Sequence, residues 1–287
     1  MIVDEGYLVL RNGTTRLVLD PRRGGAIREF DWHRIPIFRP TEPTAGDEPL
    51  EVACFAMIPF VNRIAHGQFV FQGRTVQLSR NWSGDPHPLH GYGWLAPWSV
   101  TGGTDSSASM RFEGGEDEWP WRYRCEQNFQ LLPAGLSIEL SIQNLSATPM
   151  PAMLGLHPYF CQADSASLQA SLPRVWLTDA EALPVAEAPT PLRWGFDRAR
   201  LINAIPLDHC FSGWDGVATL RWPDRIVAVR ATGCRCLQIY APLGKDFFCV
   251  EPQSAPVGAL QRGSAELSVL APGGRAAIGV HFSIGTP

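Results

Sequence analysis

The sequence predicts an all-β protein, a large antiparallel β-sandwich that forms one domain over residues 1–287. Three observations support this fold class. Short runs of alternating apolar and polar residues occur along the whole chain, and 27 glycines and 25 prolines are spread evenly between them. No window of a dozen residues combines helical periodicity with helix caps. A single domain of this length is common among all-β proteins.

The clearest strand signals are seven runs with a period of two residues, each bounded by turn residues. They cover residues 7–11, 15–19, 67–71, 135–142, 217–222, 226–230 and 236–240. Short helical turns are predicted at 181–187 and 256–261. The proline-rich stretches at 40–49 and 184–191 are predicted to be loops or extended connectors.

The composition disfavours several classes of partner. The net charge is −4, and no cluster of lysine or arginine marks a nucleic-acid surface. The longest apolar stretches are well short of the roughly 20 residues that span a bilayer, and no secretory signal is evident at the start of the sequence. We therefore expect no nucleic-acid or membrane partner.

Cysteine usage indicates a reducing compartment. The seven cysteines are an odd number, and Cys234 and Cys236 lack the two-residue spacing of a redox or zinc pair. Most of the cysteines lie in strand-like surroundings. Buried reduced thiols in a cytoplasmic protein are the expectation.

Two candidate site residues lie in the first half of the chain. Arg63 directly follows an apolar run, so it either contacts a partner or extends to solvent as a surface arginine. His90 precedes a Gly-x-Gly backbone that is typical of a site loop, although a structural histidine fits this segment equally well. His87 and His90 are a poor metal pair, because Pro88 lies between them and no acidic or cysteine neighbour follows.

Three more candidates lie in the second half. His157 follows an apolar run. A histidine at this position can be an acid or base that faces a cleft, and it can equally be a core histidine that is hydrogen-bonded to a backbone carbonyl. Glu251 ends the apolar run 247–250, where an unpaired charge costs several kcal/mol. Such a carboxylate has to be paired or pKa-shifted, and groups of this kind gather at functional sites. Asp208 lies in a similar half-apolar setting, where it can also cap a turn.

Taken in order, these segments resemble the aldose 1-epimerase (galactose mutarotase) family. The matching stretches are residues 62–67 (NRIAHG), 89–91 (LHG), 156–160 (LHPYF), 207–211 (LDHCF) and 250–253 (VEPQ). Each motif alone is short. Five motifs in the family's order, within a resemblance that spans residues 7–283, make coincidence a poor explanation.

The resemblance implies the galactose mutarotase-like β-sandwich and a set of roles. It implies that Glu251 is the general base, that His157 is the general acid, and that His90 is a second catalytic or substrate-polarising histidine. It implies sugar contacts for a further group of residues: Arg63, Asp208, Asn62 and Gln253. No cofactor or metal is implied. The expected partner is a small-molecule sugar, bound by a monomer or homodimer.

These residue types suit anomer exchange. The reaction removes the O1 proton, protonates the ring oxygen O5 and then reverses both transfers after the C1–C2 bond has rotated. A carboxylate and an imidazole beside the C1–O5 unit provide this chemistry, each contributing about 10²–10⁴-fold. Four aromatic residues are candidates for stacking on the sugar: Trp82, Tyr92, Trp94 and Phe160.

Three alternatives stay open at this stage. A hexose-6-phosphate 1-epimerase requires a phosphate site, which Arg74 or the pair at residues 22–23 would supply. A non-catalytic carbohydrate-binding protein is suggested by a departure from the family pattern at residues 257–258, where valine and glycine replace the usual acid or amide. A glycosidase would use Asp208 and Glu251 as its carboxylate pair, but it leaves the two histidine motifs unexplained.

Overall fold

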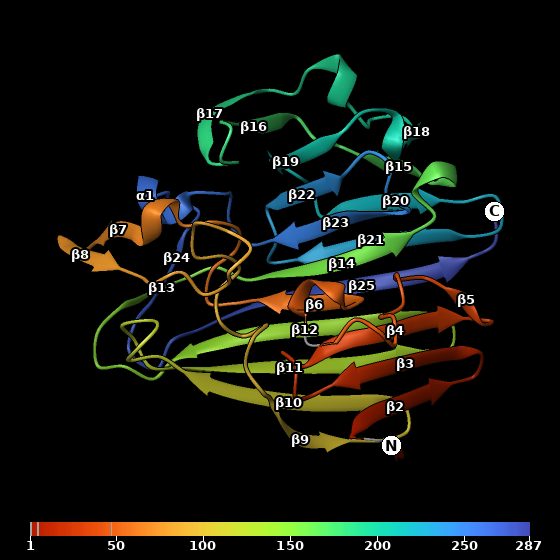
Figure 1. Ribbon diagram of the computed structural model, residues 1–287, viewed down its shortest axis with the longest axis horizontal. Coiled ribbons are helices and arrows are strands. Elements are labelled where there is room, and N and C mark those ends of the chain that lie inside the picture. Colours follow the sequence, from red (N-terminus) through yellow and green to blue (C-terminus); the bar gives the residue numbers. More distant parts are fainter. Residues whose placement is uncertain (1, 5, 47) are drawn as a thin grey trace.

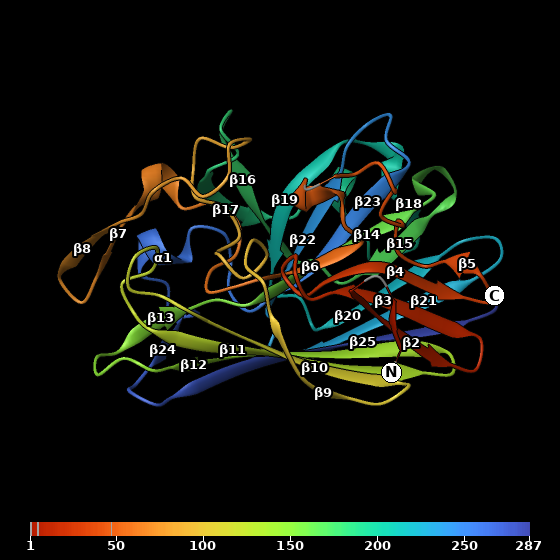
Figure 2. The same cartoon turned by 60° about the horizontal axis from the view of Figure 1, so that its bottom comes forward.

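Two large antiparallel sheets form the fold and lie against each other as the layers of a sandwich (Figures 1 and 2). The computed structural model describes residues 2–4, 6–46 and 48–287. Every ladder within the two sheets is antiparallel. The predicted fold class is therefore confirmed.

The first sheet has twelve strands in the described part of the chain, in the order β1-β2-β3-β4-β6-β14-β23-β22-β19-β16-β17 with β5 paired to β4. The strands of this sheet are β1 (Ile2–Asp4), β2 (Tyr7–Asn12), β3 (Thr15–Asp20), β4 (Ala26–Trp32), β5 (Ile35–Pro36), β6 (Cys54–Met57), β14 (Gly155–Cys161), β16 (Arg174–Thr178), β17 (Pro184–Pro189), β19 (Leu207–Ser212), β22 (Cys236–Ala241) and β23 (Phe247–Gln253). Its central strands β14 and β23 carry His157 and Glu251, whereas His90 lies outside the sheet.

The second sheet has nine strands among the described residues, in the order β18-β15-β20-β21-β25-β12-β11-β10-β9. Its strands are β9 (Ser99–Gly103), β10 (Ser107–Gly114), β11 (Tyr123–Leu132), β12 (Gly135–Asn144), β15 (Ser167–Ala170), β18 (Arg200–Leu201), β20 (Val217–Arg221), β21 (Ile226–Thr232) and β25 (Arg275–Gly285). Among the described residues, two ribbons and one short α-helix complete the fold with five 3-10 helices. The ribbons and the α-helix are β7 (Gln68–Phe71) with β8 (Arg74–Gln77), β13 (Met150–Ala152) with β24 (Ser268–Leu270), and α1 (Ala259–Arg262). The 3-10 helices are Pro49–Glu51, Ala65–Gly67, Ala163–Ser165, Leu192–Trp194 and Ile202–Ala204.

All seven predicted runs form strands, but one helical prediction is wrong. Residues 181–183 form a turn, and 184–189 form β17, the outermost strand of the first sheet. Prolines at both ends of β17 are tolerated because an edge strand has no partner on one side. The second helical prediction is confirmed in part by α1. Of the loop predicted at 40–49, residues 40–46 and 48 lie outside strands and helices, Pro49 begins a 3-10 helix (Pro49–Glu51), and Asp47 lies outside the described residues.

Burial explains why some strands alternate and others do not. In β11 every second residue is buried, because one face packs against the first sheet. Strands β14 and β23 are buried along nearly their whole length. On their inner face Phe160 packs near Phe282 of β25, with ring centroids 6.3 Å apart. Their outer face lies beneath parts of the segment 58–98 on either side of the β7–β8 ribbon, so a polar side chain there is enclosed without entering the core between the sheets.

The segment at 58–98 is held together by its own backbone. Bridges join Ile58 to Gly91 and Arg63 to Leu89. The side chain of Asn81 also stabilises this segment. Its Nδ2 donates to the Leu89 and Gly91 carbonyls at 2.8 and 2.7 Å, and its Oδ1 accepts from the Leu89 amide at 2.8 Å. The segment at 58–98 therefore has a fixed conformation over the sheet, and we call it the wall.

The remaining expectations concern membranes and thiols. Among the described residues no helix has the length and apolar character that crossing a membrane requires. All seven cysteines are free thiols, six of them buried and Cys161 partly exposed. The expectation of unpaired thiols is confirmed.

Gly91 is a point at which this wall can be tested. Its φ is +71°, and a Cβ there would lie 2.0 Å from the Ile58 carbonyl oxygen. We expect Gly91→Ala to lower the free energy of unfolding by about 3 kcal/mol, since positive φ costs about 1–2 kcal/mol and overpacking about 1–3 kcal/mol. Gly73→Ala is the matched control, because φ is +76° but nothing lies within 4 Å. Equal losses in denaturant unfolding of the two variants would show that the close approach to Ile58 is unimportant.

Candidate active site

A cavity of about 300 Å³ lies between the outer face of the first sheet and the wall formed by residues 58–98. Its volume is at the small end of the range for ligand sites in proteins. Residues from both sides line it: Leu50, Asn62, Arg63, Trp82, Gly84, Asp85, Leu89, His90, His157, Tyr159, Asp208, Gln238, Tyr240 and Glu251. Six of the seven predicted site residues are in this group.

Strand register brings Glu251 and His157 together. The ladder between β14 and β23 pairs Gly155 with Gln253 and Tyr159 with Cys249, so His157 lies opposite Glu251. Their side chains point to the same face, and His157 Nε2 lies 3.4 Å from Glu251 Oε1. Two residues 94 positions apart in the sequence therefore form a direct imidazole–carboxyl pair.

Aromatic rings enclose the imidazole of His157. It packs against both Phe55 and Tyr159, with centroid separations of 4.6 and 4.7 Å and interplanar angles of 24° and 27°. Burial lowers the pKa of His157 to about 3, with a further contribution from the charge of Arg39. In the free protein this imidazole is therefore neutral at physiological pH.

Burial acts on Glu251 in the opposite direction. Only 2% of its surface is exposed, and this burial raises its pKa well above the ordinary value, with the nearby charge of Asp208 adding to the effect. A hydrogen bond from Gln253 Nε2, at 3.4 Å from Oε2, and the charge of Arg63 oppose the shift. A carboxyl whose pKa is moved toward neutrality suits proton transfer in both directions.

His90 reaches the cavity from the wall. Its backbone has φ +57°, and the neighbouring Asn62 has φ +55°, a conformation that few residues other than glycine adopt. The two residues hold each other, because the His90 amide donates to the Asn62 carbonyl and the Asn62 amide donates to His90 Nδ1 at 3.3 Å. Since Nδ1 accepts, a neutral His90 carries its proton on Nε2. Burial, with His157 and Arg63 nearby, lowers its pKa well below the usual value.

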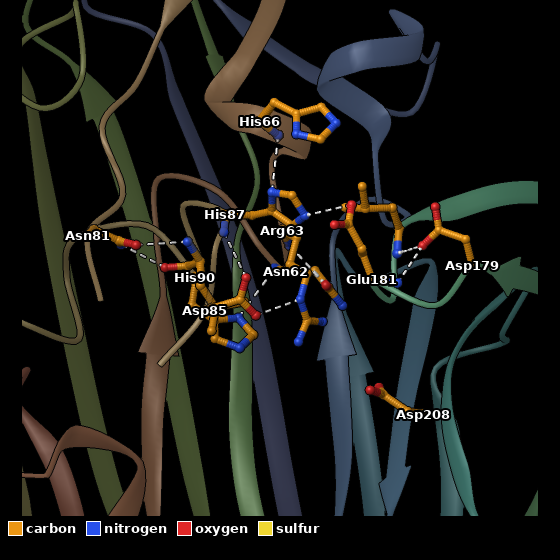
Figure 3. Close-up of polar contacts among 12 residues, drawn as sticks. Asn62, Arg63, His66, Asn81, Asp85, His87, His90, Asp179, Glu181 and Asp208 are labelled. Atoms are coloured by element: carbon orange, nitrogen blue, oxygen red, sulfur yellow. Dashed lines mark hydrogen bonds and ion pairs between the residues drawn. The ribbon is translucent and has the colours of Figure 1, made fainter. Parts of the chain in front are cut away.

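Arg63 is fixed by an acid that the sequence did not single out. Asp85 Oδ2 accepts from Arg63 Nε at 2.8 Å, and its Oδ1 accepts from the His87 amide at 2.9 Å (Figure 3). His87 is itself held, with Nδ1 accepting from the His66 amide and Nε2 lying 3.6 Å from Glu181. Arg63 also lines the cavity, so its guanidinium can reach a ligand there.

A buried amide organises the opposite side. Gln238 Nε2 donates to Asp208 Oδ1 at 2.7 Å, and Gln238 Oε1 lies 3.5 Å from Asn62 Nδ2. Burial raises the pKa of Asp208, against the opposing charge of Arg63. Gln238 also pairs with Glu251 across β22 and β23. It therefore links the wall, Asp208 and the strand that carries Glu251.

Gln253 and most of the candidate aromatic residues lie elsewhere. Gln253 has no exposed surface and contacts the Glu251 carboxylate rather than the cavity. Of the four aromatic candidates Trp82 alone is in the lining. Tyr92 donates to the Glu118 carbonyl, Trp94 stacks on Phe55, and Phe160 packs in the core.

Sequence reasoning missed Asp85, Gln238, Tyr240 and Leu50 as lining residues. The signal for Asp85 was weak, because an aspartate in a turn segment is ordinary. Gln238 occupies a polar position in an alternating strand, which normally marks the solvent face. Only the wall at 58–98 makes that face an enclosed one, and no local pattern shows which strand a distant segment covers.

Comparison with known proteins identifies the family. The sequence pattern described as aldose 1-epimerase matches residues 7–283. The uncharacterized protein YphB of Escherichia coli K12 is 30% identical over 92% of this chain and 93% of its own length. A second uncharacterized protein of that organism, YihR, is 26% identical over 84% of this chain and 81% of its own length.

Solved structures show the same fold. An Escherichia coli K12 protein provisionally named an aldose 1-epimerase has a TM-score of 0.92 at 28% identity, covering 98% of this chain and 99% of its own. A galactose 1-epimerase from Lactobacillus acidophilus has a TM-score of 0.81 at 16% identity, covering 98% of this chain and 94% of its own. The second similarity concerns the fold alone.

The pKa of His157 gives a direct test of the enclosure described above. We expect its imidazole to stay neutral as the pH falls to about 3, because burial disfavours the cation. Unfolded chains take up this proton near the ordinary value of 6.5, so the contribution of His157 to stability falls as the pH drops from 6.5 toward 3. Nitrogen NMR of the labelled protein, with His157→Asn for assignment, measures the titration. A midpoint close to 6.5 would contradict the buried, stacked imidazole.

Proposed function

Because this chain belongs to the aldose 1-epimerase family, we propose that it is a mutarotase that interconverts the α and β anomers of a neutral aldose without a cofactor. The observation that carries the proposal is the contact between His157 Nε2 and Glu251 Oε1 at 3.4 Å, on the floor of a cavity of about 300 Å³. The two oxygens of a hemiacetal, O1 and O5, are bonded to the same carbon. A general acid and a general base that lie side by side can therefore each reach one of these oxygens.

Ring opening uses the pair in its ionic form. The Glu251 carboxylate takes the O1 proton, the C1–O5 bond breaks, and the electron pair left on O5 takes a proton from the His157 imidazolium. The products are the open aldehyde, a protonated Glu251 and a neutral His157. Rotation about C1–C2 presents the other face of the aldehyde, and the same two groups run the steps in reverse.

The pair holds one proton throughout this cycle. Its neutral form, with the proton on Glu251, is favoured in the free protein, since burial raises the pKa of Glu251 and lowers that of His157. This is also the form needed to close the ring. Ring opening therefore requires one proton to pass from Glu251 to His157 when the sugar binds, and the pair titrates as a unit.

The other lining residues suit binding and charge stabilisation. His90 presents Nε2–H beside His157, with ring centroids 5.2 Å apart, where it can hydrogen-bond an oxygen that gains charge. Arg63 and Asp208 offer a charged donor and a charged acceptor for hydroxyl groups. Trp82 lines the cavity together with Tyr159 and Tyr240, and of the four aromatic candidates it is the one that can contact the apolar face of the sugar. Gln253 fits a role in positioning Glu251.

The charges around the cavity favour a neutral sugar over a phosphorylated one. Three carboxylic acids line it with one arginine, Arg63, whose Nε is already bonded to Asp85. The arginines considered for a phosphate lie apart from this lining: Arg22 and Arg23 border a separate pocket, and Arg74 is exposed on β8. A phosphate would therefore meet an excess of negative charge.

The binding-only alternative has little support from the site. Residues 257–258, the departure from the family pattern, do not line the cavity, and Val257 packs against Cys210 and Cys236.

The seven unpaired thiols fit the reducing conditions of the cytoplasm, where we place the protein.

An anomer-exchange panel tests the proposal. Polarimetry of fresh α-D-glucose and α-D-galactose, with glucose 6-phosphate in parallel, is expected to show faster mutarotation of at least one neutral aldose and no comparable effect on the phosphate. Acceleration confined to glucose 6-phosphate would establish the hexose-phosphate alternative. Sugar binding without acceleration of any common aldose would establish a carbohydrate-binding protein.

Glu251→Gln tests the base. We expect kcat to fall by about 10²–10⁴-fold, because the amide keeps the shape of the side chain but accepts no proton. Thermal unfolding should change little. Glu139→Gln is the matched control, since Glu139 is exposed on β12 of the other sheet and outside the cavity lining. An unchanged rate in Glu251→Gln would remove Glu251 from this role.

Asp85→Asn tests whether Asp85 positions Arg63. Replacing a charge-assisted bond by a neutral one should raise KM by about tenfold and change kcat less, because the proton-transfer pair is untouched. Glu113→Gln is the control, since Glu113 forms an ion pair with Arg124 at 2.7 Å away from the cavity. A loss confined to kcat, or equal effects in both variants, would contradict this role.

A further inference from the structure

One buried nucleophile beside the catalytic pair has no part in the proposed reaction. Cys249 lies two residues before Glu251 on β23, so both side chains point to the same face of the sheet. The strand register places Cys249 between Tyr159 of β14 and Tyr240 of β22, and both tyrosines line the cavity. The thiol is therefore directly beneath the cavity floor.

Cys249 completes a three-ligand set. In the described part of the chain, His157, Cys249 and Glu251 form the one group of three or more potential metal ligands whose donor atoms all lie within 4.8 Å of one another, and all three residues are buried. His157 Nε2 and Glu251 Oε1 lie 3.4 Å apart. In a tetrahedral zinc site with bonds of about 2.0–2.1 Å, two such ligand atoms lie about 3.3 Å apart. The catalytic pair already has the spacing of two zinc ligands.

We propose that His157, Cys249 and Glu251 form an inhibitory site for a thiophilic divalent cation such as Zn²⁺. Three protein ligands with a fourth position open to the cavity are the arrangement of accessible zinc sites. Binding replaces the S–H bond of Cys249 by a Zn–S bond and the O–H bond of the Glu251 carboxyl by a Zn–O bond, and both protons are released to solvent. The ion occupies both proton-transfer groups, so it excludes the sugar.

Charge and chemistry determine which ions fit. The carboxylic acids of the lining outnumber Arg63, which favours entry of a divalent cation over an anion. Burial raises the pKa of Cys249, so an ion must bind thiolate strongly enough to displace the proton. Mg²⁺ and Ca²⁺ prefer oxygen ligands and lack this affinity, whereas Zn²⁺ and Cd²⁺ have it.

The test uses Zn²⁺ in the activity assay and Cd²⁺ in ultraviolet absorption, where a Cd–thiolate bond gives a charge-transfer band. We expect Zn²⁺ to inhibit the wild-type protein, Mg²⁺ to have no effect, and Cys249→Ser and Cys249→Ala to keep basal activity while needing at least about tenfold more Zn²⁺ for inhibition. The Cd²⁺ band should be present in the wild type and absent from both variants. Cys125→Ala, which removes a buried thiol from β11 in the other sheet, is the matched control and should behave as the wild type.

Three results would overturn the proposal: no Cd²⁺ band in the wild type, a band that persists in both Cys249 variants, or zinc inhibition that is equal in the wild type and in those variants. The absorption measurement needs no turnover. A Cys249-dependent band in a protein that accelerates no anomer exchange would therefore uphold the metal site while refuting the proposed function.

Discussion

The pairing of β14 with β23 is the constraint on which the site depends. Antiparallel register places His157 opposite Glu251, and the sheet holds both side chains on its outer face. A slip of one residue would turn one of them into the core between the sheets. The site is therefore specified by main-chain hydrogen bonds in the most buried part of the first sheet, so the acid–base pair needs no flexible loop to assemble it.

Enclosure gives this pair its chemistry. An imidazole and a carboxyl on an exposed sheet face would titrate near their ordinary pKa values. The wall at 58–98 and the stacked rings of Phe55 and Tyr159 remove water, so the pKa of Glu251 rises and that of His157 falls. The two shifts favour a neutral pair at rest. Cys249 is buried beside Glu251 and His157, where its thiol is a potential third ligand for a metal ion.

Most of the fold could be predicted from the sequence, because period-two patterns and turn residues are local signals. The helical turn predicted at 181–187 was an error, because pairing with β16 at the edge of the first sheet makes residues 184–189 the strand β17. The motifs around Arg63, His90, His157, Asp208 and Glu251 identified residues that the structure brings to one cavity. Gln253 could not be placed behind Glu251, nor Asp85 and Gln238 in the lining, because those positions depend on contacts between distant segments.

The central claim is that Glu251 and His157 act on the two oxygens of a sugar's anomeric carbon. A crystal structure of the Glu251→Gln variant with a neutral aldose in the cavity tests it most directly. We expect C1 at the pair, with O1 in hydrogen-bond contact with residue 251 and O5 with His157, and hydroxyl groups at Arg63 and Asp208. A sugar bound with its anomeric carbon away from this pair, or outside the cavity, would contradict the account.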